Sequence, residues 1–224
     1  MATATGTNEV RLAFNWSKSR VQECLDKGQR HEIVRFLSER HTQRFFYPIR
    51  CLKEAQAGGS GYGFAIMALC SLLIETIECY RQGLPSSSKN DLGSLKTSAA
   101  NVSAPPEYKL DTLAFPNSGG VFGSFFTRDQ HKIFFPGVDG KVFYEKIRCG
   151  LLHQAQTKDA WRIVRTGKFW EPDPTSRINR DEFSERLEDC FKAYLRELDN
   201  ESNWNSVDLW IPARRKIWWL IQIS

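Results

Sequence analysis

Residues 143–156 read FYEKIRCGLLHQAQ, and this stretch is predicted to be the central helix around which the rest of the chain folds. At about 100° per residue, Phe143, Tyr144, Ile147 and Leu151 fall on one stripe of such a helix. An apolar stripe with helical spacing is typical of a helix face that packs on a core. The other elements are therefore expected to build a wall behind this stripe.

The second face of the predicted helix carries an arginine and a histidine. Arg148 and His153 are five positions apart, so they lie roughly 140° apart around the axis and do not meet squarely within one chain. The short arc between them holds Glu145, Cys149 and Leu152. The Arg–His pair could converge if two copies of this face met across a two-fold axis. Glu145 either orients Arg148 from one turn away or forms an ordinary surface ion pair.

Spacing alone is a weak signal for a functional pair. Arg35 and His41 give a second match, and the alternative for either pair is a structural histidine near a surface arginine. Gly150 adds a separate observation, because glycine costs about 1 kcal/mol relative to alanine inside a helix. Its usual role is to let another backbone approach closely, so close packing is expected there.

Further helices are predicted from apolar periodicity and from residues that begin or end helices. They span residues 18–27 after a capping Ser17, residues 30–57 with a kink or break at Pro48, and residues from a capping Asn179 or Asp181 to about Leu198. Another, over residues 62–81, is apolar nearly all round, which indicates a buried core helix. Glu75 lies in its C-terminal half, where a carboxylate either needs a partner or points to solvent.

The remaining segments are predicted to be irregular or short. Residues 1–14 form a frayed start, and residues 84–118, rich in Ser, Pro and Asn, form a long loop or mobile insertion. Residues 161–169 alternate apolar and polar side chains, which favours a short β-hairpin. Residues 212–224, PARRKIWWLIQIS, form either a strand or helix docked on the core or a contact for a membrane surface or a partner. The chain is therefore predicted to be a single, mostly α-helical bundle with a small hairpin and a long insertion.

Composition agrees with a globular chain and argues against some classes of site. Of 224 residues, 41% are hydrophobic and 12% aromatic, enough for a sizeable core. The formal net charge of +5 is compatible with a polyanionic partner without identifying one. The glycine-rich turn at 58–61 lacks the Gly-Lys-Ser/Thr ending of a phosphate loop. No Cys or His spacing matches a zinc site, so neither a metal nor a cofactor is expected.

The expected location follows from the termini, the apolar runs and the cysteines. Residues 1–20 have no apolar core of the kind found in signal peptides, and the apolar run at 64–74 is too short to cross a bilayer. Four of the six cysteines lie in apolar runs, where free thiols behave as small hydrophobic groups. The chain is therefore expected to be cytoplasmic, with reduced thiols and no membrane span.

The segment YEKIRCGLLHQAQTK, residues 144–158, followed by a short aromatic β-like stretch, resembles the core of HEPN-domain proteins. Members of that superfamily are α-helical domains in which an arginine is followed, after four to six residues, by a histidine. The similarity is concentrated in residues 144–158. It extends more loosely to the helix with Glu75 and to the helix around 183–198, and it does not cover residues 84–118.

The resemblance implies a helical bundle that dimerises through the motif helices. It also implies metal-independent RNA cleavage in members whose motif is intact. Carried over to this chain, the catalytic pair is Arg148 and His153. Glu145, Cys149 and Glu75 are the expected supporting residues.

Two positions depart from the family pattern. The residue after the arginine is often polar in active members and is Cys149 here. Some toxin members place a tyrosine two residues after the histidine, where a nucleotidyltransferase modifies it; that position is Ala155 here, so this regulation is not expected. In this frame Arg35 and His41 are a chance match.

The residue types of the pair suit RNA cleavage. RNA supplies its own nucleophile, the 2′-hydroxyl, and histidine is the side chain that most readily takes or gives a proton near neutrality. Arginine is always charged, and its planar fork can hold a phosphate and stabilise charge that develops in the transition state. Single-stranded RNA is the expected substrate, because its splayed bases and flexible phosphates are easier for side chains to reach.

These observations leave three functions to compare. The first is a homodimeric HEPN-type endoribonuclease, a toxin or antiviral defence effector that a partner protein could regulate. The second is a non-catalytic HEPN-like module that binds RNA or nucleotide, or only dimerises. The third is a scaffold whose basic, aromatic residues 214–219 engage a partner. RNA cleavage in EDTA separates the first from the second, and deletion of residues 212–224 tests the third.

Overall fold

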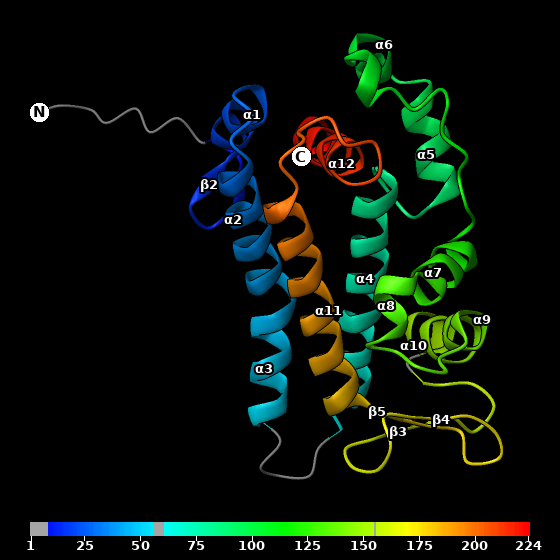
Figure 1. Ribbon diagram of the computed structural model, residues 1–224. Helices are drawn as coiled ribbons and strands as arrows, with labels where there is room; N and C mark the ends of the chain where they lie inside the picture. The colour runs from blue at the N-terminus through cyan, green and yellow to red at the C-terminus, as the bar shows by residue number, and fades with distance from the viewer. Residues whose placement is uncertain (1–8, 56–60, 155) are drawn as a thin grey trace, which may run out of the picture.

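In the residues that the computed structural model describes, 9–55, 61–154 and 156–224, three helical segments run lengthwise, side by side (Figure 1). They are α2–η1–α3 (Arg30–His41, Thr42–Phe46 and Tyr47–Glu54), α4 (Gly63–Gln82) and α11 (Arg180–Asn200). The last of these, α11, packs against both α2 and α4. The predicted mostly α-helical fold is confirmed. The ends of two predicted segments, residues 1–8 and 56–57, lie outside the described residues.

Local sequence signals account for where the helices begin and end. The Asn179 side chain accepts hydrogen bonds from two backbone N–H groups in the first turn of α11, and Ser17 caps α1 (Lys18–Asp26) through one such bond. Helix α4 ends at Gly83, whose φ of +69° is a left-handed conformation that glycine adopts without strain. These boundaries agree with the predicted ones.

The break predicted near Pro48 is a π turn and not the end of a helix. The segment η1 replaces the α pattern between α2 and α3, and Pro48 follows in the first turn of α3. Proline has no N–H to donate, so the regular ladder cannot run through it unchanged. A single π-helical turn absorbs the irregularity, and the rod continues.

A layer of short helices lies against α4 on the side away from α2 (Figure 1). It consists of α7 (Ser118–Thr127), α8 (Asp129–Lys132), α9 (Gly140–Val142), η4 (Phe143–Arg148) and α10 (Cys149–Gln154). Helix α12 (Trp210–Ile223) lies across one end of the bundle and contacts α1 and α4. The motif segment is therefore a layer beside the core helix α4, and not itself the centre of the bundle.

Small sheets flank the helices. Strands β1 (Arg11–Ala13) and β2 (Trp16–Ser17) pair antiparallel, so part of the predicted frayed start is ordered. Strands β3 (Arg162–Val164), β4 (Trp170–Glu171) and β5 (Arg177–Asn179) form a sheet in the order β3–β5–β4. The small β content is confirmed, but residues 161–169 do not form a hairpin by themselves. Strand β5, which leads into α11, inserts between β3 and β4 and pairs with both.

The segment 84–118 is more structured than the predicted long loop. It contains α5 (Lys89–Lys96), α6 (Ala99–Ser103) and the short 3₁₀ helix η3 (Pro106–Tyr108). Ser88 and Ser98 each accept a hydrogen bond from the first turn of the helix that follows, and Leu92 is completely buried. The serines that suggested an irregular loop are therefore helix N-caps.

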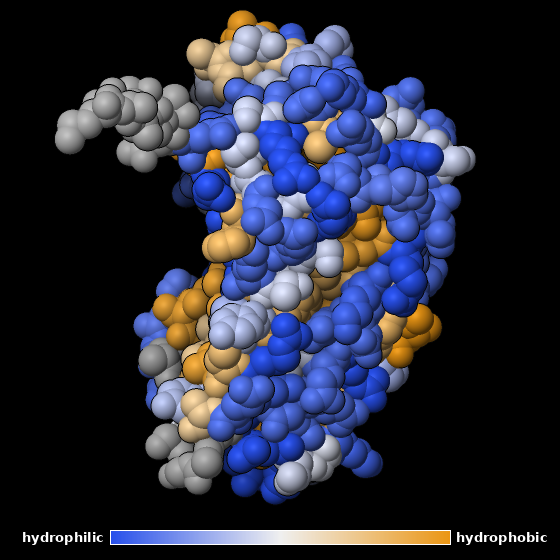
Figure 2. Space-filling view, turned by 90° about the vertical axis from the view of Figure 1, so that its left-hand side faces the viewer, coloured by the Kyte–Doolittle hydropathy of each residue, from blue (hydrophilic) through white to orange (hydrophobic). Residues whose placement is uncertain are grey.

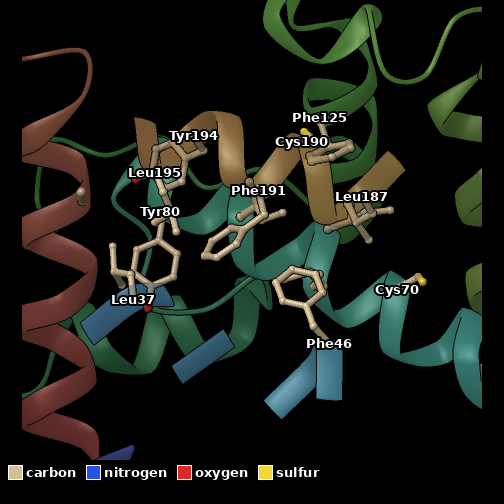
Figure 3. Packing of buried hydrophobic residues seen from close by; sticks show 14 of the residues in the cluster. Leu37, Phe46, Cys70, Tyr80, Phe125, Leu187, Cys190, Phe191, Tyr194 and Leu195 are labelled. Atoms are coloured by element: carbon tan, nitrogen blue, oxygen red, sulfur yellow. The ribbon is translucent and has the colours of Figure 1, made fainter. Parts of the chain in front are cut away.

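Aromatic and aliphatic side chains from the three long segments fill the core (Figure 3). Examples are Leu37 and Phe46 from the first segment, Tyr80 from α4, and Leu187 and Phe191 from α11. Complete burial of one such side chain contributes about 1.5–3 kcal/mol. On the side of α1 to α3, polar ridges flank a band of apolar side chains (Figure 2). All six cysteines are free, and four of them, Cys24, Cys70, Cys79 and Cys190, are buried.

Helix α4 is long and apolar enough, by length and composition, to cross a membrane. Within its 18-residue apolar window, 67% is buried inside the protein. One such helix is weak evidence for a membrane span, because the buried core helix of a soluble protein has the same length and composition.

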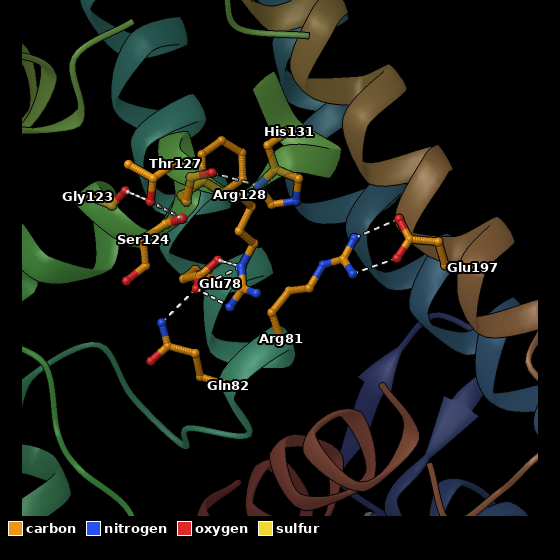
Figure 4. Close-up of polar contacts among 10 residues, drawn as sticks. Glu78, Arg81, Gln82, Gly123, Ser124, Thr127, Arg128, His131 and Glu197 are labelled. Atoms are coloured by element: carbon orange, nitrogen blue, oxygen red, sulfur yellow. Dashed lines mark hydrogen bonds and ion pairs between the residues drawn. The ribbon is translucent and has the colours of Figure 1, made fainter. Parts of the chain in front are cut away.

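Charged side chains on α4 are clamped on both sides (Figure 4). Glu78 is completely buried and accepts three hydrogen bonds from Arg128, between 2.6 and 3.1 Å. Arg81 donates two to Glu197 of α11, at 2.6 and 2.9 Å. His131 lies beside both arginines, and burial lowers its pKa to about 4. The Glu78–Arg128 and Arg81–Glu197 pairs tie α4 to the short-helix layer and to α11.

Candidate active site

The motif segment is a helix in two parts, the π turn η4 followed by α10. Asp139 caps the preceding α9 by accepting hydrogen bonds from two backbone N–H groups. Phe143 and Ile147 are completely buried and Leu151 is 7% exposed, so the predicted packing stripe is confirmed. Through this stripe the helix packs against α4 and α7. The packing fixes the rotation of the helix about its axis and so determines which way the other side chains point.

Arg148 reaches from this helix to α4. Its Nε donates to Oε1 of Glu75 at 2.9 Å, and the Ser87 hydroxyl donates to Oε2 of Glu75 at 2.6 Å. Glu75 is 7% exposed, so the carboxylate in the core helix has the partners that its burial requires. Within the described ranges, Nη1 and Nη2 of Arg148 make no hydrogen bond. The guanidinium is therefore anchored at Nε, and its other two nitrogens keep their hydrogen-bonding capacity within the described residues, in a side chain that is 16% exposed.

Glu145 does not take the orienting role predicted for it, since no ion pair joins it to Arg148 in the described part of the chain. The reason is the π geometry of η4, whose i→i+5 bonds bring residues four or five apart onto one face. Tyr144, four positions before Arg148, lies beside it instead, with Cζ of Arg148 5.6 Å from the ring centre. Burial, followed by a hydrogen bond with Cys149, raises the pKa of the Tyr144 hydroxyl.

His153 is exposed near the end of α10 and forms no hydrogen bond or ion pair with the residues the structure describes. Leu152 beside it is 42% exposed. No polar or ring contact joins His153 to Arg148 among these residues, as the bracketing geometry predicts. The adjacent prediction about Ala155 lies outside the described residues.

Gly150 is where the backbone after the helix folds back onto it. A Cβ at this position would lie 2.4 Å from the carbonyl oxygen of Gln156. The Lys158 N–H donates to the Lys146 carbonyl oxygen at 2.9 Å, and this hydrogen bond holds the segment after the helix against it. The predicted close approach of another backbone is confirmed, because residues 156–158 lie directly against the helix at Gly150.

Two cavities are lined by side chains that Arg148 contacts. One, of about 470 Å³, is lined by Asn117, Gly119, Lys141, Tyr144 and Glu145. The other, of about 310 Å³, is lined by residues that include Phe45, Leu72, Glu75, Ser86, Ser87 and Lys216. Tyr144 borders the first and Glu75 the second, and Arg148 contacts both of these side chains. Both volumes fall in the range of small-molecule sites, about 300–1,000 Å³.

The second Arg–His match is structural. His41 is 1% exposed, and its ring centre lies 4.5 Å from that of Phe191 and 5.4 Å from that of Tyr80. Burial lowers the pKa of His41 to about 3, so the ring is neutral at physiological pH. Arg35 lies on the surface and pairs with Glu32 at 2.8 Å. Arg35 and His41 therefore do not form a site.

The C-terminal helix α12 is docked on the core, which is the first of the two predicted alternatives. Trp219 is completely buried, and Arg214 and Trp218 are 5% and 8% exposed. Arg214 donates to the carbonyl oxygen of Trp204 at 2.8 Å. The basic and aromatic residues that the scaffold hypothesis requires on the surface are therefore largely inside the protein.

Ser87 and Tyr144 belong to the site although the sequence did not single them out for it. Ser87 lies in the segment predicted to be a loop, and no sequence signal connects it to Glu75. Tyr144 was assigned only to the packing stripe. Its position four residues before an arginine is a signal for an aromatic–arginine contact on one helix face.

The described residues contain no group of three or more His, Cys, Asp or Glu side chains placed to hold a metal ion. Arg148 offers a cation that contacts side chains lining two cavities, which suits an anionic ligand with a bulky body. The exposed His153 lies further along the same helix.

Comparisons with known proteins assign no family to the chain. No protein-family model matches it, and no match is found among curated proteins or solved structures.

Proposed function

We propose that the protein is a metal-independent endoribonuclease of the HEPN type that cuts single-stranded RNA. The observation that carries the proposal is the way Arg148 is held. Glu75 anchors Nε of Arg148, while Nη1 and Nη2 have no hydrogen-bond partner in the described residues. The exposed His153 lies on the same helix as Arg148. A guanidinium anchored in this way presents a fork of two N–H-bearing nitrogens to a phosphate.

In the proposed reaction the RNA 2′-hydroxyl attacks the adjacent phosphorus. The bond from the 2′-oxygen to phosphorus forms and the bond from phosphorus to the 5′-oxygen breaks, which yields a 2′,3′-cyclic phosphate and a 5′-hydroxyl. His153 either removes the proton from the 2′-hydroxyl or delivers one to the departing 5′-oxygen. Arg148 stabilises the negative charge that develops on the non-bridging oxygens.

The proposal includes a second copy of the chain, because Arg148 and His153 bracket one helix face and do not meet. Two histidines from two chains could then divide the roles of base and acid. Helices α4 and α10, which pack against each other, carry the exposed apolar side chains Phe64, Leu72 and Leu152, each 41–42% exposed. Exposed apolar side chains near the motif favour an interface there.

The cavity beside Tyr144 supports a single-stranded substrate. It offers an aromatic ring, the Asn117 and Glu145 side chains and the Lys141 ammonium within about 470 Å³. A base that is splayed out of a single strand can enter such a space, whereas a base stacked in a duplex cannot. As an RNA-cutting enzyme, the protein would act in the cytoplasm as a toxin or antiviral effector under the control of a partner protein.

The test is cleavage of an end-labelled single-stranded RNA by purified protein in EDTA. His153→Ala is expected to lower the rate at least about 100-fold, since general acid–base catalysis contributes factors of this order or more. His31→Ala is the matched control, because His31 is also exposed but lies on α2. Full cleavage by His153→Ala would contradict the proposed HEPN-type ribonuclease. Light scattering of the wild type reports the dimer, and a stable monomer contradicts the two-chain site.

A non-catalytic RNA- or nucleotide-binding module is the second candidate. It is favoured by His153, which has no hydrogen bond in the described residues to orient its ring, whereas general bases are usually held by a further group. Such a module binds the same RNA without forming a cyclic-phosphate product. RNA binding with no cleavage in any buffer selects this candidate over the ribonuclease.

A further inference from the structure

Arg40, Arg44 and Lys216 are three cations near Tyr80, and one of them, Lys216, lines the smaller cavity. Nη1 of Arg40 donates to the carbonyl oxygen of Leu12, and Nη2 of Arg44 reaches the same oxygen at 3.4 Å. Arg40 also forms a hydrogen bond with the Tyr80 side chain. Nζ of Lys216 lies 6.0 Å from the ring centre of Tyr80. Two guanidinium groups and an ammonium group thus converge on one tyrosine.

None of these cations has a carboxylate partner in the part of the chain that the structure describes. Lys216 donates to the carbonyl oxygen of Pro85 at 2.5 Å, and this neutral acceptor does not cancel its charge. The acidic side chains on the adjoining face of α4 are engaged elsewhere, Glu75 by Arg148 and Glu78 by Arg128. The cluster therefore carries uncompensated positive charge.

Burial makes this charge costly. It lowers the pKa values of both Lys216 and Arg40. The neighbouring His41 is kept neutral first by its own burial and then by the positive charges of Arg40, Lys216 and Arg44. Buried charges in proteins are normally paired. Lys216 lines the cavity without a carboxylate partner in the described residues, and the buried Arg40 lies near it, so an anion in the cavity would complete the site. Arg44 is exposed and adds only to the surrounding positive potential.

The cavity has the form that an anion with an attached organic group requires. Lys216 lines it together with the hydroxyl-bearing Ser86 and Ser87, and Phe45 and Leu72 supply an apolar wall. Glu75 also lines it, but that carboxylate is already bound by Arg148 and Ser87. The cavity therefore offers a cation, hydroxyl groups and an aromatic side chain within about 310 Å³.

We propose that this cavity is a phosphate-binding site. Lys216 binds the phosphate directly, Arg40 and Arg44 add positive potential behind it, and Phe45 contacts the attached nucleoside. The favoured source is an RNA strand whose neighbouring phosphate lies at Arg148, and only this choice of source rests on the proposed ribonuclease function. A free nucleotide offers the same chemistry.

The first arm of the test measures binding of a fluorescein-labelled 2′-O-methyl RNA strand, which cannot be cut, by anisotropy at several salt concentrations. Lys216→Met is expected to weaken binding about tenfold, the loss of one charge-assisted contact. It should also reduce the slope of log affinity against log salt by about 0.7, the value for one phosphate on a single strand. Arg44→Gln should give a smaller loss.

The matched control is Lys132→Met, which removes the same charge from an exposed lysine that pairs with Asp129. It should leave binding of the strand unchanged. The second arm measures the rise in unfolding temperature caused by AMP. Loss of that rise in Lys216→Met, with binding of the strand unchanged, supports the phosphate site with a free nucleotide as its ligand. If neither probe distinguishes Lys216→Met from Lys132→Met, the proposal is overturned.

Arg44→Gln keeps the proposal testable if Lys216→Met does not fold, because Arg44 is exposed. Binding of both probes equal to that of Lys132→Met then overturns the site. The outcome is independent of catalysis. If cleavage depends on His153 but Lys216→Met binds both probes normally, only the proposed phosphate site is ruled out. If Lys216→Met weakens binding but the wild-type protein cuts no RNA, only the proposed ribonuclease function is ruled out.

Discussion

Glu75 and Arg148 stabilise each other across two helices. The Glu75 carboxylate lies in an apolar core helix, where it needs partners, and Arg148 needs an anchor that leaves part of its guanidinium free. The 2.9 Å contact between Nε and Oε1 meets both requirements. Glu75 acts through Arg148, so in the proposed enzyme it is a positioning residue and not a catalytic one.

Glu75→Gln is expected to lower kcat for RNA about 100-fold with a smaller change in KM. The amide can still accept a hydrogen bond, but it no longer holds the guanidinium by charge, and small displacements of a catalytic group have effects of this size. Glu145→Gln is the matched control, because Glu145 forms no ion pair with Arg148 in the described residues. Steady-state kinetics of both variants provide the measurement. Equal losses in the two would contradict the positioning role.

Gly150→Ala is expected to lower the free energy of unfolding by about 1–3 kcal/mol, because the new Cβ would overlap the Gln156 carbonyl oxygen, 2.4 Å away. Gly123→Ala in α7 serves as the comparison. Among the residues that the structure describes, nothing lies within 4 Å of a Cβ at Gly123, so helix propensity alone should stabilise this variant by up to about 1 kcal/mol. Urea denaturation measures both, and a Gly150 variant as stable as the wild type would refute the close contact.

Between elements, the pairing of α4 with its neighbours is electrostatic as well as apolar. Glu78 has no exposed surface, and Arg128, at the junction of α7 and α8, supplies its positive partner. Arg81 makes the equivalent contact with α11 through Glu197. The Glu78–Arg128 pair orients the short-helix layer, which carries the motif, relative to the core helix, and the Arg81–Glu197 pair orients α11 relative to it.

Arg128→Met is expected to destabilise the protein by about 3–5 kcal/mol, since it leaves a buried carboxylate without its partner. Adding Glu78→Gln to that variant should recover part of the loss, because the uncompensated charge is removed. Lys132→Met, which breaks an exposed pair on the same short helix, should change stability by less than about 1 kcal/mol. Urea denaturation measures the free energy of unfolding of the three variants. Equal losses in Arg128→Met and Lys132→Met would show that the Glu78–Arg128 pair does not stabilise the fold.

Elements whose signals are local were predictable from sequence, and those that depend on distant partners were not. Ser17, Asn179 and Gly83 mark helix ends through their own backbone contacts, so α1, α4 and α11 follow from the sequence. The insertion of β5 between β3 and β4, and the contact of Ser87 with Glu75, join residues that no local pattern connects. Likewise, Glu75 and Arg148 were each expected to matter, but their contact spans 73 positions.

At the scale of the whole molecule, stability depends on two buried histidines. Burial lowers the pKa of His41 to about 3 and that of His131 to about 4, below the ordinary value of about 6.5. Between about pH 6.5 and pH 4 the unfolded chain therefore binds protons that the folded protein does not. The stability that this neutrality contributes is fully present above pH 6.5 and is lost as the pH falls.

Because His41 and His131 are neutral in the folded protein, the free energy of unfolding is expected to fall by up to about 2.7 kcal/mol per pH unit as the pH drops from 6 towards 4. In His131→Asn one titrating group is absent, so the dependence on pH should be shallower by about half of that slope. Urea denaturation at a series of pH values measures both proteins. Parallel curves for the variant and the wild type would show that His131 is not linked to folding.

The π turn η4 also affects how this chain should be aligned with others. A π turn holds one residue more than an α turn, so side chains before it and after it are out of phase by about 100°. A relative with a regular α-helix here would have one residue fewer between the part of the helix before residues 143–148 and the part after them. Alignment across residues 143–148 therefore requires a one-residue gap, and an ungapped comparison would pair Tyr144 and Glu145 with positions that point in other directions.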